Sequence, residues 1–196
     1  MNQEERIAFF EEKYVPLFSG IFGPGDKIYI GQKNTICRFC NKTPAETTFS
    51  NISHAIPEFL GNKQFILHEE CDECNKLFSE SLEDSLDKYT KPYRTLSQIK
   101  GKKKVPTYKS NNENNRIELT APGAFEIKAN IDDEFCEIDE INNQIKINPH
   151  LEPHTPAAVY KALVKIALSI IPNGELSGFQ HAISWIRERD HTKEFI

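Results

Sequence analysis

The chain has 196 residues, of which 38% are hydrophobic and 27% charged, and its formal net charge is -5 at pH 7. This length is typical of one domain, or of one domain with a small module, and the hydrophobic content excludes a wholly disordered chain. No run reaches the roughly 18 apolar residues of a membrane helix, and the acidic start lacks the basic and apolar regions of a signal peptide. We therefore expect a cytoplasmic protein with no membrane partner, whose five cysteines stay reduced.

The N-terminal residues have the pattern of a helix, a loop and a short strand. Apolar residues recur at helical spacing over residues 2–14, and Pro16 should end this helix. Glycine and proline residues at positions 20–25 then predict a loop, and residues 27–30 a strand.

Residues 37–88 contain four of the five cysteines. Short extended pieces are expected at 47–49 and 64–67, followed by a helix from about 71 to 88. Apolar residues on one face of this helix should be buried: Leu77, Phe78, Leu82 and Leu86.

A basic stripe follows, with eight basic residues and no acid: Lys88, Lys91, Arg94, Lys100, Lys102, Lys103, Lys104 and Lys109. The rest of the chain carries 16 basic and 29 acidic side chains. Such a stripe can bind phosphate on an acidic protein, because charges are screened over about 10 Å, and three interleaved tyrosines can stack on bases: Tyr89, Tyr93 and Tyr108. The other interpretation is a solvated lysine loop. The polar run 110–115 predicts a linker.

The C-terminal part combines strands with two helices. Apolar and polar residues alternate in four segments, which predicts three or four antiparallel strands with one buried face: Ile117/Leu119, Phe125/Ile127, Cys136/Ile138 and Ile145/Ile147. Cys136 should be a core residue. Thr155 and Pro156 are typical of an N-cap and a first helical turn, and they open an apolar helix to residue 171 that must be buried in the monomer or in a dimer. A last helix should follow, with four apolar residues on one face: Leu176, Phe179, Ile183 and Ile186.

Two CxxC pairs, Cys37/Cys40 and Cys71/Cys74, are the most informative feature. Two intervening residues let one turn direct both sulfurs at a metal about 2.3 Å away, and two pairs supply the four thiolates of a tetrahedral zinc site. A structural zinc can contribute on the order of 10 kcal/mol to folding. The sequence therefore predicts a zinc-stabilised segment that needs no large apolar core.

Between the pairs the sequence reads SHAIPEFLG, with Ser53 and His54 at its start, and Asn75 directly follows Cys74. This combination resembles the HNH (ββα-metal, His-Me finger) endonucleases, in the branch whose two CxxC pairs frame the catalytic motif. The resemblance covers about residues 37–88, a quarter of the chain.

The resemblance implies a role for each matching residue. His54 takes the place of the general base, and Asn75 that of a residue that holds a divalent catalytic metal, Mg2+ or Mn2+, or orients the base. The four cysteines would hold a structural zinc, distinct from the catalytic metal. The position before the histidine is usually acidic or histidine, but here it is Ser53, and a hydroxyl is a poor ligand for Mg2+.

The missing carboxylate leaves two interpretations open. Glu83 follows Asn75 by two turns, about 80° around the helix, so that its long side chain would complete the metal site. Other candidate ligands near in sequence are Glu58, His68, Glu69 and Glu70. Alternatively, the site is impaired.

The basic stripe follows the helix that carries Asn75, so it is expected to flank the same site and bind nucleic acid. The residues expected to do so are Arg94, Lys100, Lys102, Lys103 and Lys104. Arg38, inside the first cysteine pair, either touches phosphate or is an ordinary surface residue.

The sequence as a whole predicts an α+β fold: a zinc-stabilised ββα (treble-clef-like) module with an N-terminal helix over residues 1–109, and an accessory α+β region over 110–196. The favoured function is a metal-dependent endonuclease acting on DNA. The alternative is a catalytically impaired zinc module that binds nucleic acid or protein. A third interpretation is a defence or mobile-element nuclease held inactive until a partner or foreign DNA appears, with acidic residues 132–140 shielding the basic stripe. A homodimer or a partner protein stays open.

Overall fold

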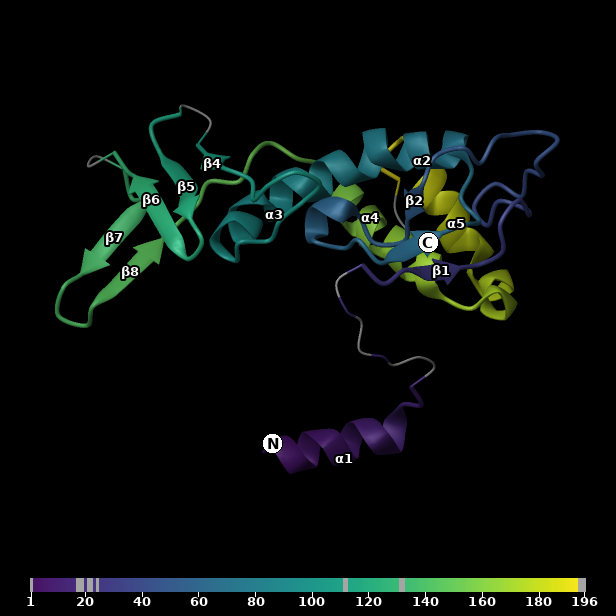
Figure 1. The fold of residues 1–196 in the computed structure, drawn as a ribbon, viewed down its shortest axis with the longest axis horizontal. Helices are drawn as coiled ribbons and strands as arrows, with labels where there is room; N and C mark the ends of the chain where they lie inside the picture. Colours follow the sequence, from purple (N-terminus) through teal and green to yellow (C-terminus); the bar gives the residue numbers. More distant parts are fainter. Residues whose placement is uncertain are drawn as a thin grey trace.

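The computed structural model describes residues 2–16, 20, 23, 25–110, 113–130 and 133–193 (Figure 1). It has the predicted mixed α+β class. In chain order the elements are α1 (Gln3–Lys13), β1 (Ile28–Ile30), β2 (Ser53–His54), η1 (Glu58–Leu60), β3 (Phe65–Leu67), α2 (Asp72–Phe78), η2 (Ser79–Glu83), α3 (Asp84–Leu96), β4 (Tyr108–Lys109), β5 (Arg116–Ala121), β6 (Ala124–Lys128), β7 (Cys136–Asp139), β8 (Gln144–Ile147), α4 (Pro156–Ile170), η3 (Asn173–Phe179) and α5 (Gln180–Arg187). None of the described helices is both long enough and apolar enough to span a membrane.

A small sheet of three strands, in the order β1-β3-β2, supports the cysteine region. β1 is parallel to β3, and β2 is antiparallel to it. The strands predicted at 27–30 and 64–67 are confirmed as β1 and β3. The extended piece predicted at 47–49 is wrong as a strand: the second strand is β2, where Ser53 pairs with Leu67 and His54 with Ile66.

The helix predicted over residues 71–88 is longer than expected. α2, the π-helical turn η2 and α3 follow one another without a break as far as Leu96. Pro92 lies inside α3, where the missing N–H would ordinarily disfavour a helix. Burial of Leu86, Arg94 and Thr95 on this helix offsets that cost, so the basic stripe begins on a packed helix and not in a loop.

α4 and α5 pack into the same core as the cysteines, so residues on both sides of the predicted division at 109/110 share it. Pro156 stands in the first turn of α4 as predicted, but Thr155 makes no side-chain capping bond. Fully buried side chains of this core include one each from α2, η2, α3 and α5: Phe78, Leu82, Leu86 and Ile186. α4 is only partly buried, because Tyr160, Leu163 and Ile170 on its other side are about half exposed.

A second core lies between α3 and the remaining strands. The four predicted strands are confirmed, but they form two sheets, β4-β5-β6 and β7-β8. Tyr108, Ile117 and Phe135 are fully buried there, and Cys136 is half-buried against them. The expected buried face is only partly formed in the β7-β8 hairpin, where Cys136 and Ile147 pack against this core but Ile138 is 70% exposed.

Residues 110–115 are not a linker, contrary to the prediction. β4 pairs with β5, and Ser110 donates its N–H to the carbonyl of Asn115 at 2.9 Å. Asn115 is fully buried and donates its own N–H to Ser110 Oγ. The segment therefore closes a hairpin, although residues 111–112 lie outside the described residues.

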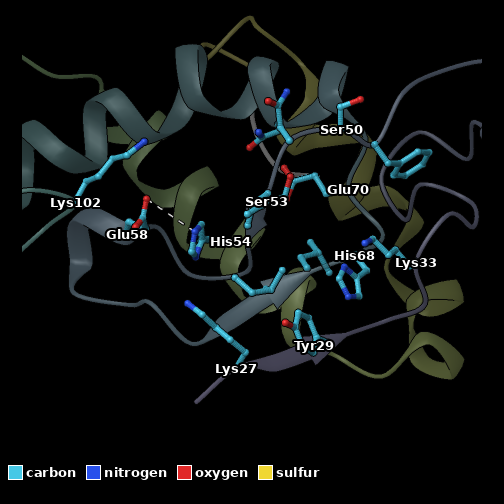
Figure 2. Close-up of a pocket in the computed structure, with 16 residues that line it drawn as sticks. Lys27, Tyr29, Lys33, Ser50, Ser53, His54, Glu58, His68, Glu70 and Lys102 are labelled. Carbon is cyan, nitrogen blue, oxygen red and sulfur yellow. Dashed lines mark ion pairs between the residues drawn. The ribbon is translucent and has the colours of Figure 1, made fainter. Parts of the chain in front are cut away.

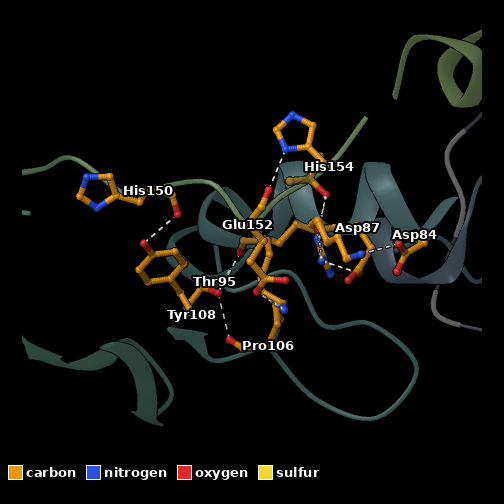
Figure 3. A network of polar contacts seen from close by, with 12 residues as sticks. Asp84, Asp87, Thr95, Pro106, Tyr108, His150, Glu152 and His154 are labelled. Carbon is orange, nitrogen blue, oxygen red and sulfur yellow. Dashed lines mark hydrogen bonds and ion pairs between the residues drawn. The ribbon is translucent and has the colours of Figure 1, made fainter. Parts of the chain in front are cut away.

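Polar contacts join α3 to the second core and to the segment before α4 (Figure 3). The Thr95 hydroxyl donates to the Pro106 carbonyl at 3.0 Å, and the Tyr108 hydroxyl donates to the His150 carbonyl at 2.9 Å. Lys91 pairs with Glu152 at 2.5 Å. These contacts fix the path of the chain from the small sheets back to α4.

The N-terminal helix is confirmed as α1, and Asn2 and Glu5 form a capping box at its start. None of its residues is buried, and Figure 1 shows it apart from both cores.

Arg38 connects the first cysteine pair to the C-terminal helices. Its guanidinium donates to the carbonyls of Leu168 and Ser169, both at 2.9 Å, where the last carbonyls of α4 carry partial negative charge. It also pairs with Glu69 at 2.9 Å. Arg38 is 6% exposed, so both roles predicted from the sequence, phosphate contact and free surface residue, are wrong.

Gly31 allows Glu69 to reach Arg38. Its φ is +75°, and a Cβ placed there would lie 2.3 Å from Glu69 Cδ. Any other side chain at this position would displace the carboxylate.

We expect Arg38→Ala to lower the free energy of unfolding by about 3–5 kcal/mol, because it leaves Glu69 buried without its ionic partner. Lys146→Ala is the matched control, since it removes an exposed ion pair to Glu137 and should leave the stability of the protein unchanged. Denaturant titration of zinc-loaded protein measures both. Equal stability of the two variants would show that the Arg38 contacts do not anchor α4.

Candidate active site

The four predicted cysteines come together. The sulfurs of Cys37, Cys40, Cys71 and Cys74 all lie within 4.8 Å of one another. Three of these residues are buried, and Cys40 is half-buried. The Sγ atoms of Cys40 and Cys71 are 3.7 Å apart, which matches the edge of about 3.8 Å of a tetrahedron with Zn–S bonds of about 2.3 Å.

The charge state of the cluster also favours a bound cation. The interaction between the Cys37 and Cys74 side chains lowers the pKa of Cys37 to about 4 and raises the pKa of Cys74. Burial raises the pKa of Cys40 to about 11. Four thiolates this close would repel one another, so full deprotonation requires a dication, and zinc binding supplies it. The donor set and its spacing therefore fit a structural zinc.

Asp72, which the sequence did not single out, holds the chain that leads into β2. Its carboxylate accepts N–H groups from Ser50 at 3.1 Å and Asn51 at 2.8 Å, and the Thr48 hydroxyl at 2.5 Å. Because Asp72 directly follows Cys71, the zinc cluster and the approach to His54 are fixed together.

His54 lies on β2 with 17% of its side chain exposed. Its Nε2 is 3.9 Å from Glu58 Oε2 (Figure 2), and its buried Nδ1 has no hydrogen-bond partner among the described residues. Burial lowers its pKa, and the positive charges of Lys27, Lys165 and Lys102 lower it further, against the opposing effect of Glu58. The imidazole is therefore neutral at pH 7 and able to accept a proton.

A cleft of about 830 Å³ opens beside His54 (Figure 2). Its polar lining combines bases, acids and amides: Lys27, Lys33, Ser50, Asn51, Ser53, His54, Glu58, His68, Glu70, Asn75 and Lys102. The structure thus brings His54, Ser53 and Asn75 into one cavity. Ser53 is 2% exposed, and its Oγ lacks a hydrogen-bond partner in the part of the chain that the structure describes.

A buried lysine from α4 stands behind the cleft. Lys165 Nζ lies 3.1 Å from Glu70 Oε2 and 3.6 Å from Glu83 Oε1, and it donates to the carbonyl of His54 at 3.2 Å. Sequence reasoning missed Lys165 because 111 residues separate it from His54. The available signal was the presence of two lysines, Lys161 and Lys165, inside a mostly apolar helix.

Two candidate acids differ in their relation to the cleft. Glu70 is fully buried and lines it, and burial raises its pKa to about 7. Neither of its oxygens makes a hydrogen bond to another described residue. Glu83, the acid favoured from the sequence, pairs with Lys165 and does not line the cleft. Glu69 is held by Arg38.

The basic stripe divides into buried and exposed residues. Arg94 is 4% exposed, and its guanidinium binds Asp87 and the Phe59 carbonyl. The prediction that Arg94 binds nucleic acid is therefore wrong, because its charge is used inside the fold. Tyr108 is fully buried, so it cannot stack on a base. Lys102 lines the cleft, and the other predicted lysines are exposed: Lys100, Lys103 and Lys104.

Cys71→Ser should abolish the binding of one zinc ion per chain and destabilise the first core, because three thiolates leave the tetrahedron incomplete. Cys136→Ser is the matched control, since Cys136 lies in the second core and should keep the full zinc content. Elemental analysis after dialysis, with thermal unfolding, measures both effects. Equal zinc content in the two variants would contradict the assigned ligand set.

Comparison with known families agrees with this geometry. The family model described as HNH endonuclease matches residues 37–90. Neither the search of curated proteins nor the search of solved structures found a significant match. The matched range spans both cysteine pairs, His54 and Asn75 and stops within α3. The resemblance stated from the motifs is confirmed: this segment matches the HNH endonuclease family and carries its cysteine pairs in position to bind a metal.

Proposed function

We propose that the protein is a metal-dependent endonuclease that hydrolyses phosphodiester bonds in DNA, with His54 as general base. The observation that carries the proposal is a half-buried histidine with a lowered pKa, which belongs to the segment that matches HNH endonucleases and lines a cleft together with three lysines.

Three residues that line the cleft have parts in this reaction: His54, Asn75 and Glu70. His54 takes the proton of the attacking water, as a neutral imidazole can do near pH 7. A Mg2+ or Mn2+ ion bound in the cleft would supply the Lewis acid that this reaction needs. Asn75 and Glu70 would hold that ion, because both line the cleft and the oxygens of Glu70 make no hydrogen bond to the described chain.

The lysines of the cleft bind the phosphates on either side of the bond that is cut. Lys27, Lys33 and Lys102 line the cavity that contains His54, and phosphate contacts of this kind fix the position of a strand without reading its sequence.

A zinc-bound module that binds but does not cut is the second candidate. It is favoured by Ser53, which lacks the carboxylate usual at that position, and by Lys165, whose ammonium already pairs with Glu70 and Glu83. Such a module would keep the lysine-lined cleft and the zinc site and lose only the catalytic metal.

A defence or mobile-element setting, with a partner protein or a second copy that controls activity, is a proposal from charge pattern alone. Asp132, the first residue of the acidic stretch, lies outside the described residues. Within the stretch, Glu137 pairs with Lys146 in its own hairpin. Salt-insensitive activity of the free protein would count against charge shielding.

Cleavage of supercoiled plasmid tests the proposed function. Zinc-loaded protein should nick or linearise the plasmid with Mg2+ or Mn2+, and His54→Ala should reduce the rate about 100- to 10,000-fold because the general base is lost. His150→Ala is the control, since that side chain is exposed and lies outside the cleft. Equal rates for all three proteins would remove His54 from the mechanism.

The pH dependence follows from the lowered pKa of His54. Because the neutral form is the base, the rate should rise with pH, and the midpoint of this acid limb should lie below the usual histidine pKa of about 6.5. The Glu58 carboxylate raises the pKa of His54, so Glu58→Gln should shift this acid limb to lower pH. Single-turnover rates between pH 4.5 and 8 measure the shift. An acid limb above pH 7, or a shift upward in Glu58→Gln, would contradict the assignment.

Ser53→Asp separates the two candidate functions. In a nuclease with an incomplete ligand set, the added carboxylate should raise the metal-dependent rate, since Mg2+ prefers carboxylate oxygens. Ser50→Asp is the control, because Ser50 lines the same cleft outside the motif. No cleavage by wild type or Ser53→Asp, at full zinc content, would favour the binding module.

A further inference from the structure

We propose that Tyr29, stacked on His68, is a platform for an unpaired nucleobase of the substrate, so that the site takes a single-stranded nucleic acid segment. This inference rests on the proposed function and names its substrate class. No motif of the sequence indicated either residue as a stacking site.

The two rings form a preformed stack on the surface. Their centroids are 4.7 Å apart and their planes differ by 7°. Tyr29 is 59% exposed, and both residues line the cleft (Figure 2). A second parallel stack among the described residues, Tyr108 on Phe135, is fully buried in the second core, so it is not open to a ligand.

The strand register places this stack beside His54. Ile66 on β3 pairs with Tyr29 on one side and with His54 on the other. Residues paired across strands point to the same face of a sheet, and two strand spacings separate their backbones by about 10 Å. A base on Tyr29 would therefore lie about three stacked nucleotide steps, at about 3.4 Å each, from a phosphate at His54.

The charges around the stack fit a nucleic acid backbone. Lys33 and Lys102 form no ion pair within the described ranges, and Lys27 donates only to the backbone carbonyl of Lys63. Many lysines elsewhere on the surface are instead paired with carboxylates: Lys42, Lys76, Lys88, Lys91, Lys109, Lys128, Lys146 and Lys193. The described lysines without a carboxylate partner thus include Lys27, Lys33 and Lys102, which line the cleft together with Tyr29 and His54.

The stacking geometry selects an unpaired base. In a duplex both faces of each base are already covered by its neighbours, whereas a base in a single strand has a face to offer an aromatic ring. A cross-strand aromatic pair can also stabilise a small sheet, so the test must separate stacking on a ligand from support of the fold.

The test is binding by the full-length, zinc-loaded protein in buffer without Mg2+ or Mn2+. The probes are single-stranded DNA and RNA of about 12 nucleotides with one central 2-aminopurine, and the same DNA as a duplex. The variants are Tyr29→Leu and Tyr29→Phe. The control is Tyr160→Leu, because Tyr160 is 56% exposed and rests against Trp185, outside the cleft.

We expect the wild type to bind the single strands more tightly than the duplex and to change the 2-aminopurine fluorescence on binding. Tyr29→Leu should weaken single-strand binding about 5- to 150-fold, while Tyr29→Phe and Tyr160→Leu bind like the wild type. Comparison of the affinities for DNA and RNA then shows whether the site prefers deoxyribose or ribose. Zinc content and thermal unfolding of each variant report on the fold.

Equal single-strand affinity of Tyr29→Leu and wild type would overturn the platform, as would tighter binding of the duplex. A folded Tyr29→Phe that binds as weakly as Tyr29→Leu would overturn it as well. These outcomes are independent of catalysis. If the protein never cleaves but Tyr29→Leu weakens single-strand binding, the stacking platform is supported and the nuclease is not. If the protein cleaves through His54 but Tyr29→Leu binds like the wild type, the nuclease is supported and the platform is not.

Discussion

The close approach of four cysteine sulfurs is the constraint on which the site depends. Five residues that shape or line the site lie within two positions of one of these cysteines: Arg38, Glu69, Glu70, Asp72 and Asn75. Four sulfurs within 4.8 Å of one another need a dication to be stable as thiolates. Once they are fixed, Asp72 fixes the chain that enters β2, and β2 carries His54.

The C-terminal helix α4 also holds residues of the site in place. Arg38 binds the last carbonyls of α4, and Lys165 on the same helix reaches the carbonyl of His54 and the carboxylate of Glu70. The family match ends at residue 90, so this support comes from a part of the chain that the match does not include. Lys165 contacts the backbone beside the cleft and pairs with two acids, so the charge of the cleft depends on α4.

Local patterns predicted the parts of the site that are close in sequence. The CxxC spacing identified the four cysteines whose sulfurs come together, and the two residues assigned to catalysis by the resemblance, His54 and Asn75, line one cleft. Contacts between distant residues were invisible to such patterns. Arg94 looked like a free cation but is bound inside the fold, and Tyr108 looked like a stacking residue but fills the second core. Tyr29 meets His68 only because β1 joins the sheet beside β3, and no spacing rule gives that pairing.

The measurement that tests the account most directly is plasmid cleavage at fixed Mg2+ as a function of zinc bound per chain, from none to one. If the cysteine cluster holds His54 and Asn75 in a working cleft, the rate should rise in proportion to zinc content and reach its maximum at one zinc. Equal cleavage by zinc-free protein would contradict the dependence of the site on the cluster, and no cleavage of any DNA form at full zinc content would contradict the nuclease itself.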